Sequence, residues 1–167
     1  ILGPALVMIF WLTEWVKRRI PLPYDWNSGR LADDEYRRIK KILAAVLLAC
    51  FVNPQFVGGI WYPIKIMLDS FGESKFFYSF LGELHRPISR HNILDMGHRP
   101  IYKLLLILSS LGFILNRRRI DLRLFTFWLF CLLFSLAAAR NVIFFGMAAY
   151  LSLVINFSQL RWNIPAW

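Results

Sequence analysis

The sequence has few acidic residues: 10 Asp and Glu stand against 20 Lys and Arg, which gives a formal net charge of +10. In a soluble protein this excess would suggest a nucleic-acid partner. Here the basic residues gather in short segments beside apolar blocks, as they do in the cytoplasmic loops of membrane proteins. The charge pattern therefore predicts a lipid bilayer as the partner, and no nucleic acid.

Cysteine and the common catalytic motifs are also scarce. The two cysteines, Cys50 and Cys131, each lie inside an apolar block without metal-ligand spacing, where a thiol often packs as a small hydrophobe. The chain has no Gly-rich phosphate loop, no Gly-x-Ser-x-Gly elbow, no Cys-x-x-Cys pair and no His-Glu-x-x-His. No cofactor is evident from these patterns.

Apolar sequence is abundant: 57% of the 167 residues are hydrophobic and 17% are aromatic. It comes in blocks rather than in amphipathic periods, and blocks of this kind predict membrane spans, although several are short. The alternative is buried helices of a soluble protein. We predict an all-α, polytopic integral membrane helix bundle in one domain, with about five spans at residues 1–16, 42–64, 101–115, 122–139 and 142–157.

The charges of the loops predict an orientation. Residues 17–41 carry eight basic side chains, and a second basic loop covers residues 117–123. Basic loops stay on the cytoplasmic side, so the loop at residues 65–99 and the turn at residues 140–141 are predicted to be extracytoplasmic. We expect a multi-pass integral membrane protein, and we expect this chain to be a fragment of a longer one.

Two local features concern the second predicted span. Residues 32–41 place acids before bases, an order that suits the helix macrodipole and predicts a short surface helix leading into the span. Further on, a proline removes a backbone donor and a glycine pair adds flexibility. A kinked or broken outer half is therefore expected at Asn53, Pro54, Gly58 and Gly59.

Arg140 and Asn141 interrupt an apolar stretch of 36 residues that would be about 54 Å long as one helix at roughly 1.5 Å per residue. A bilayer core is only about 30 Å thick, so we expect the chain to turn back at Arg140. Three roles stay open for Arg140: an interface anchor, a partner of a loop acid such as Glu83 or Glu73, or a ligand of a lipid phosphate, whose geometry suits guanidinium. Asn141 could add a neutral donor.

The loop at residues 65–99 collects the remaining polar candidates. Carboxylate and imidazole groups suit either metal binding or acid–base chemistry, and they occur here at Glu83, His85, His91, Asp95 and His98. Their spacing matches no standard ligand motif, so no metal site is predicted. Solvated loop residues and substrate contacts stay open as alternatives, with His98 among the substrate-binding candidates.

Three features in this order resemble bacterial membrane proteins related to the GT-C glycosyltransferases. The first is Asn53-Pro54 near the end of a span, followed by Tyr62-Pro63. The second is a Glu-x-x-x-Pro segment from Glu83 to Pro87, and the third is the small-residue run that ends in Arg140-Asn141, at residues 137–141. The resemblance covers roughly residues 42–153, through short motifs.

The chain departs from the family pattern in three places. It has Gln55-Phe56 where relatives often have Tyr-Gly, and Leu84 where they often have Trp. It also lacks the first outer loop that carries the catalytic acidic motif of GT-C enzymes. The resemblance thus implies a later membrane portion whose main catalytic carboxylate lies outside this chain, so that the catalytic residues are unknown.

What the resemblance implies is a transferase of the bacterial inner membrane, with its active site on the extracytoplasmic face and a polyprenyl-phosphate-linked sugar as its donor. Arg140 would lie near the phosphate, while Glu83 and Arg86 would contact sugar hydroxyls or hold the loop. A divalent cation is implied only by the family. The alternatives are a transporter or flippase module, suggested by the broken second span, and a non-catalytic membrane scaffold subunit.

Overall fold

The computed structural model describes residues 2–21, 26, 29–52, 58, 61–62, 65, 87–88 and 99–159. Within these residues the regular structure is entirely helical, which confirms the all-α prediction. The chain divides into two compact units, one of residues 1–21 with 29–84 and one of residues 22–28 with 85–167. Each unit is described separately.

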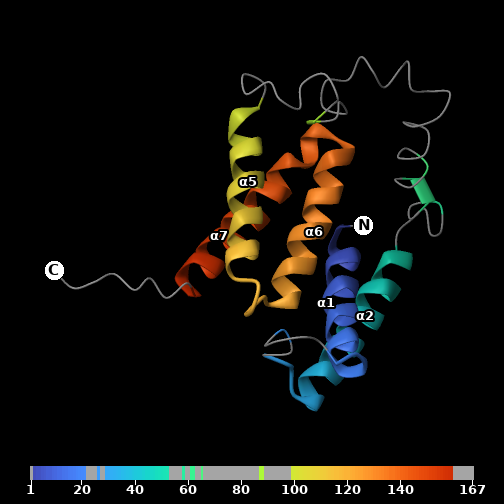
Figure 1. The fold of residues 1–167 in the computed structure, drawn as a ribbon. Helices are drawn as coiled ribbons and strands as arrows, with labels where there is room; N and C mark the ends of the chain where they lie inside the picture. Colours follow the sequence, from blue (N-terminus) through green and yellow to red (C-terminus); the bar gives the residue numbers. More distant parts are fainter. Residues whose placement is uncertain are drawn as a thin grey trace. The chain divides into compact units, whose positions relative to one another are not determined.

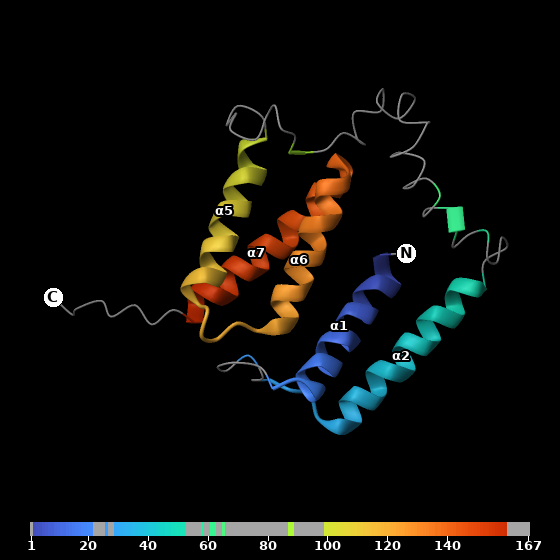
Figure 2. The ribbon, with the colours of Figure 1, turned by 45° about the vertical axis from the view of Figure 1, so that its right-hand side comes forward.

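The first unit contains two helices, α1 (Leu2–Arg19) and α2 (Asp33–Phe51), which pack side by side (Figure 2). Three acids, Asp33, Asp34 and Glu35, occupy the first turn of α2, where carboxylates are favourable to the helix dipole. The Glu35 carboxylate accepts a hydrogen bond from the Ala32 backbone N–H at 3.1 Å. The predicted surface helix therefore exists, and it continues without a break into the second apolar block.

Helix α2 ends at Phe51, where the Val52 N–H donates to the Ala49 carbonyl at 3.1 Å. The helix thus stops just before Asn53-Pro54, whereas the predicted span continued to residue 64. Asn53, Pro54 and Gly59 lie outside the described residues, and so does the predicted kink. Gly58 is described and exposed.

The α1–α2 hairpin is closed by polar contacts at its connection. Arg18 donates to the Asp33 carboxylate and to the Leu31 carbonyl, the latter at 3.0 Å, and its guanidinium lies 4.2 Å from the centre of the Tyr36 ring. The Leu31 N–H donates to Glu14 at 3.2 Å. Glu14 and Lys17 are both buried, with their charged atoms 4.0 Å apart. The end of α1 is therefore fixed to the start of α2 by charged groups.

The second unit contains α5 (Pro100–Leu115), α6 (Leu122–Ala137), a single 3-10 turn η3 (Ala139–Asn141) and α7 (Val142–Gln159). Helix α7 packs against both α5 and α6 and crosses them obliquely (Figure 1). The first turns of α5 and α7 line one groove, and Asn116 after α5 bonds to Asn156 near the end of α7. Helices α5 and α7 therefore run in the same general direction. Helix α6, which lies between them in the sequence, runs in the opposite direction.

The core of the second unit is aromatic at its centre and small where helices approach. The Tyr102 and Phe145 rings lie 5.2 Å apart, and those of Phe113 and Trp128 lie 5.4 Å apart. Ala148 and Ala149 of α7 are fully buried. Small residues at these positions let the backbones come close, as helices packed in membranes commonly do.

Among the residues that the structure describes, one helical segment, Ala139–Gln159, is long and apolar enough by length and composition to cross a membrane. Helices α5 and α6 are apolar but have 16 residues each, about 24 Å at 1.5 Å per residue, against a hydrocarbon core of about 30 Å. The last three predicted apolar blocks therefore coincide in position with α5, α6 and α7, and only the segment that contains α7 has the length of a membrane span.

Candidate functional site

The predicted break in the long apolar stretch is present. Helix α6 ends at Ala137, Ala138 is extended (φ −154°, ψ 143°), and η3 leads directly into α7. Figure 1 shows the chain reversing between α6 and α7 at this point. The interruption at Arg140 and Asn141 therefore separates two helices, as their position in the sequence indicated.

Asn141 holds this turn together. It is buried, its side-chain amide donates to the Phe134 carbonyl at 3.0 Å, and its backbone N–H donates to Ala138 at 3.0 Å. Phe134 lies in the last turn of α6, whose carbonyls have no partner within the helix. The amide thus has a structural role, and a ligand contact by its second hydrogen stays a prediction.

Arg140 is exposed at the same turn. Its neighbours in sequence point inward, since Asn141 is buried and Ala138 is 7% exposed. The guanidinium is thus available to water or to a ligand at this end of the second unit. The two acids considered as its partners, Glu73 and Glu83, lie outside the described residues.

The other predicted site residues, Glu83, Arg86 and His98, also lie outside the described residues, as do His85, His91 and Asp95. Within the described part of the chain, no group of three or more His, Cys, Asp or Glu side chains is placed to hold a metal ion. The loop candidates therefore stay predictions.

Buried polar side chains link the helices of the second unit. The Tyr102 and Ser135 hydroxyls lie 2.8 Å apart, and the Trp128 indole N–H donates to the Ser109 hydroxyl at 2.9 Å. Both contacts join α5 to α6. Neither pair is evident in the sequence, where Ser109 and Ser135 look like small residues within apolar blocks.

A third polar contact joins α5 to α7. The Asn116 side-chain amide donates to Asn156 at 2.9 Å and to Gln159 at 2.8 Å. The Asn156 amide in turn donates to the Ser152 carbonyl at 2.8 Å. These bonds satisfy buried amides that would otherwise be costly, by about 1–3 kcal/mol for each group left without a partner.

The outward faces of the same helices are apolar. On α7 the exposed set includes Ile143, Met147 at 63%, Leu151 and Val154, while Ser152 and Asn156 face inward. On α5 Ile101 is 73% exposed and Ser109 is fully buried. The inward faces thus combine aromatic, small and polar side chains, and the outward faces are rich in large aliphatic side chains, unlike the polar outer face of a helix packed against a core in water.

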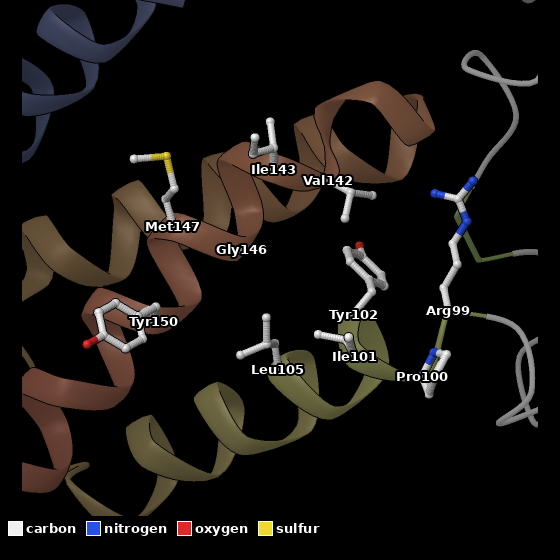
Figure 3. Close-up of a pocket in the computed structure, with 10 residues that line it drawn as sticks. All are labelled: Arg99, Pro100, Ile101, Tyr102, Leu105, Val142, Ile143, Gly146, Met147 and Tyr150. Atoms are coloured by element: carbon white, nitrogen blue, oxygen red, sulfur yellow. The ribbon is translucent and has the colours of Figure 1, made fainter.

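A groove lies between the first halves of α5 and α7, with a volume of about 580 Å³. Figure 3 shows Arg99 at one end and Tyr150 at the other. We call it the α5–α7 groove; its lining residues are Arg99, Pro100, Ile101, Tyr102, Leu105, Val142, Ile143, Gly146, Met147 and Tyr150. Arg99 was not among the predicted site residues. Its position directly before a proline that begins an apolar helix could have indicated a cation at the end of that helix.

In the first unit, the contact with Arg18 holds the pKa of the Asp33 carboxyl below its usual range. The hydrogen bond from Arg18 is the main cause, followed by the Coulombic attraction of the same guanidinium. Both favour the ionised carboxylate. This contact belongs to the predicted cytoplasmic loop, and its role is to close the hairpin.

Comparisons with protein-family models, with curated proteins and with solved structures found no match to this chain.

Proposed function

We propose that the chain is a five-span membrane module of a GT-C-like glycosyltransferase, which handles a lipid-phosphate-linked sugar on the extracytoplasmic face. The observation that carries the proposal is the polarity of the second unit, whose polar side chains lie inside and whose large aliphatic side chains lie outside. The exposed Arg140 adds a cation at the end where the phosphate would lie.

This distribution of polar and aliphatic side chains supports the proposal that lipid hydrocarbon surrounds the second unit. In water, each large aliphatic side chain left exposed forgoes about 1.5–3 kcal/mol of burial free energy. In a bilayer the same side chains meet lipid at no such cost, and the buried Ser and Asn side chains form the bonds between helices that hydrocarbon cannot supply. Helix α7 illustrates this pattern, with Ser152 and Asn156 inward and Ile143 and Val154 outward, although Phe145 is also buried.

Arg140 supports the proposal that this end of the second unit binds a lipid phosphate. A guanidinium presents a planar set of donors that matches phosphate oxygens, and Arg140 is exposed at the α6–α7 turn. Within the described residues, the side-chain hydrogen bond that closes the turn comes from Asn141. The exposed Arg140 side chain could therefore contact a ligand. The donor sugar and the acceptor would meet the loop at residues 65–99.

The test replaces Arg140 by alanine in the full-length protein and measures the binding of decaprenyl phosphate in nanodiscs. A hydrogen bond to a charged group contributes about 1.5–3 kcal/mol, so Arg140→Ala should weaken binding by about tenfold or more. Arg118→Ala is the matched control, because Arg118 is exposed in the loop before α6, at the other end of that helix. Equal binding by the wild type and Arg140→Ala would reduce Arg140 to an interface anchor.

The second candidate is a non-catalytic scaffold subunit. It is favoured by the hydrogen bonds of Tyr102, Trp128 and Asn116, which join helices to one another. A scaffold predicts that Arg140→Ala leaves lipid binding and transferase activity unchanged, while substitutions in the helix contacts disrupt assembly.

A further inference from the structure

The α5–α7 groove has the form of a binding site for one hydrocarbon chain. Apart from Arg99, the side chains that line it are apolar or aromatic, and Gly146 contributes no side chain at its middle (Figure 3). Its volume of about 580 Å³ falls within the range of roughly 300–1,000 Å³ that holds a single small-molecule ligand. The groove runs along two helices and ends at a cation.

Arg99 sets the charge of this groove. It is the one charged residue among those that line it, and it is half-buried at the start of α5. Its backbone is left-handed (φ 54°), an uncommon conformation for a residue other than glycine. Within the described residues no hydrogen bond or ion pair of its guanidinium is seen. A single cation at the end of an apolar groove is complementary to a lipid with one negative charge.

We propose that the α5–α7 groove binds an anionic glycerophospholipid of the surrounding bilayer, with one acyl chain along the groove and the phosphodiester at Arg99. A phosphodiester carries one negative charge, which one guanidinium matches. A phosphomonoester, such as a polyprenyl phosphate without its sugar, carries about −1.5 to −2 at neutral pH, so it would leave part of its charge unmatched in this groove; a sugar-linked polyprenyl phosphate is a diester and matches the charge equally. The membrane also presents its own phospholipids at high local concentration, which favours their binding by mass action.

This site is separate in its residues from the one proposed for the sugar donor, although it rests on the proposed membrane location. Arg99 and Gly146 define the phospholipid site, and Arg140 is not among the residues that line the groove. Substitutions can therefore address the two sites one at a time.

Gly146 offers a direct way to block the groove. A Cβ placed on Gly146 meets no atom within 4 Å, so a larger side chain enters open space instead of displacing a neighbour. Gly146→Leu should then fill the groove and leave the helix packing intact. Gly3→Leu is the matched control, because Gly3 also lies in a helix with nothing within 4 Å of its Cβ.

The experiment uses the full chain in detergent and titrates it with three lipids, followed by native mass spectrometry: phosphatidylglycerol, phosphatidylcholine and decaprenyl phosphate. Arg99→Asn should weaken phosphatidylglycerol binding by about tenfold and leave phosphatidylcholine unchanged; asparagine is chosen because it tolerates the left-handed backbone. Gly146→Leu should reduce the binding of both phospholipids, and Gly3→Leu should change neither. Arg118→Gln is the charge control.

Several results would overturn the proposal. One is phosphatidylglycerol binding that is unchanged in both Arg99→Asn and Gly146→Leu. Another is displacement of phosphatidylglycerol by equimolar decaprenyl phosphate in the wild type but not in Gly146→Leu, which would give the groove to the lipid donor. If Gly146→Leu does not fold by circular dichroism and size exclusion, Met147→Trp tests the same groove, since Met147 is largely exposed along it.

A separate measurement distinguishes this failure from that of the proposed function. Extraction of membranes with alkaline carbonate reports whether the chain is integral to the bilayer at all. Retention in the membrane together with loss of lipid selectivity would reject the groove alone. Release into the soluble fraction would reject the membrane module and the groove together, whereas a loss of decaprenyl phosphate binding confined to Arg140→Ala would leave both proposals standing.

Discussion

Asn141 shows how one side chain forms a turn that contains no glycine or proline. Its amide bonds to the last turn of α6 through Phe134, which supplies a partner to a carbonyl that the helix itself leaves unsatisfied. Asn141→Ala should lower the free energy of unfolding by about 1–3 kcal/mol, because a buried group loses its partner. Thermal unfolding in detergent, followed by circular dichroism, measures this.

Arg140→Ala is the natural control for that measurement, because Arg140 is exposed at the same turn. It should change the free energy of unfolding by no more than an ordinary surface substitution does, about ±0.5 kcal/mol. A larger loss in Arg140→Ala than in Asn141→Ala would show that the turn is held by the arginine.

Asp33 gives a pH dependence to the first unit. Its pKa lies below the usual value of 3.8 because Arg18 stabilises the carboxylate. A carboxyl with a depressed pKa in the folded state contributes stability that is fully present above its unfolded pKa and is lost as the pH falls through the lower, folded one. We therefore expect the stability of the hairpin to fall below about pH 3.8. Asp33→Asn should make this loss of stability at acid pH smaller.

The comparison of unfolding curves at several acid pH values checks this expectation. Asp34→Asn is the matched control, since Asp34 is the next residue in the same helical turn. If the free energy of unfolding falls equally at acid pH in the wild type and in Asp33→Asn, the contact with Arg18 adds nothing to stability, as is found for many exposed ion pairs.

At the scale of the elements, the contact between α5 and α7 is close at Gly112. A Cβ there would lie 3.5 Å from the Asn156 Cβ and 3.5 Å from the Phe157 ring. Gly112→Leu should overpack this contact and destabilise the second unit by about 1–3 kcal/mol. Gly146→Leu, on the open side of α7, should cost much less, and equal melting temperatures for the two variants would contradict this account.

The Asn116–Asn156 hydrogen bond is a second test of the same contact. A double-mutant cycle with alanine at each position isolates the pairwise term. Between membrane helices such couplings average about 0.6 kcal/mol and reach about 1.7. We expect a value within this range, and the bond from Asn116 to Gln159 does not contribute because it is lost in both variants that lack Asn116; strictly additive single substitutions would contradict it.

The elements that could be predicted from the sequence are those set by local pattern. The apolar blocks at residues 101–115, 122–139 and 142–157 match α5, α6 and α7, and the acids before residue 36 match the start of α2. Of the second predicted span, residues 42–51 lie in α2, which ends at Phe51, and most of residues 53–64 lie outside the described residues. Hydropathy gives the apolar stretch but not the residue at which a helix stops.

The tertiary contacts could not be predicted in the same way. Ser109 and Ser135 are isolated polar residues in apolar blocks, and their partners Trp128 and Tyr102 are known only once α5 is placed against α6. Arg99 was overlooked for a related reason. A cation in a polar loop looks solvated until the helix that follows is found to form a groove.

At the scale of the whole molecule, the loop charges make a prediction about topology. Cysteine replaces Ser28 or Ser89 in a chain whose Cys50 and Cys131 have been changed to alanine. A membrane-impermeant thiol reagent applied from outside should label Ser89→Cys and not Ser28→Cys, because basic loops stay cytoplasmic. Labelling of position 28 from outside would reject the proposed orientation.

The bonds of Tyr102 and Asn116 also constrain how the protein is made. Tyr102 of α5 and Asn116, which directly follows α5, each have their partner on a segment synthesised later, Ser135 for the first and Asn156 for the second. During translation α5 therefore emerges with two polar groups that nothing yet made can satisfy. Asn116 therefore lacks its α7 partner until forty further residues have been synthesised, and the contact between α5 and α7 can be completed only after that.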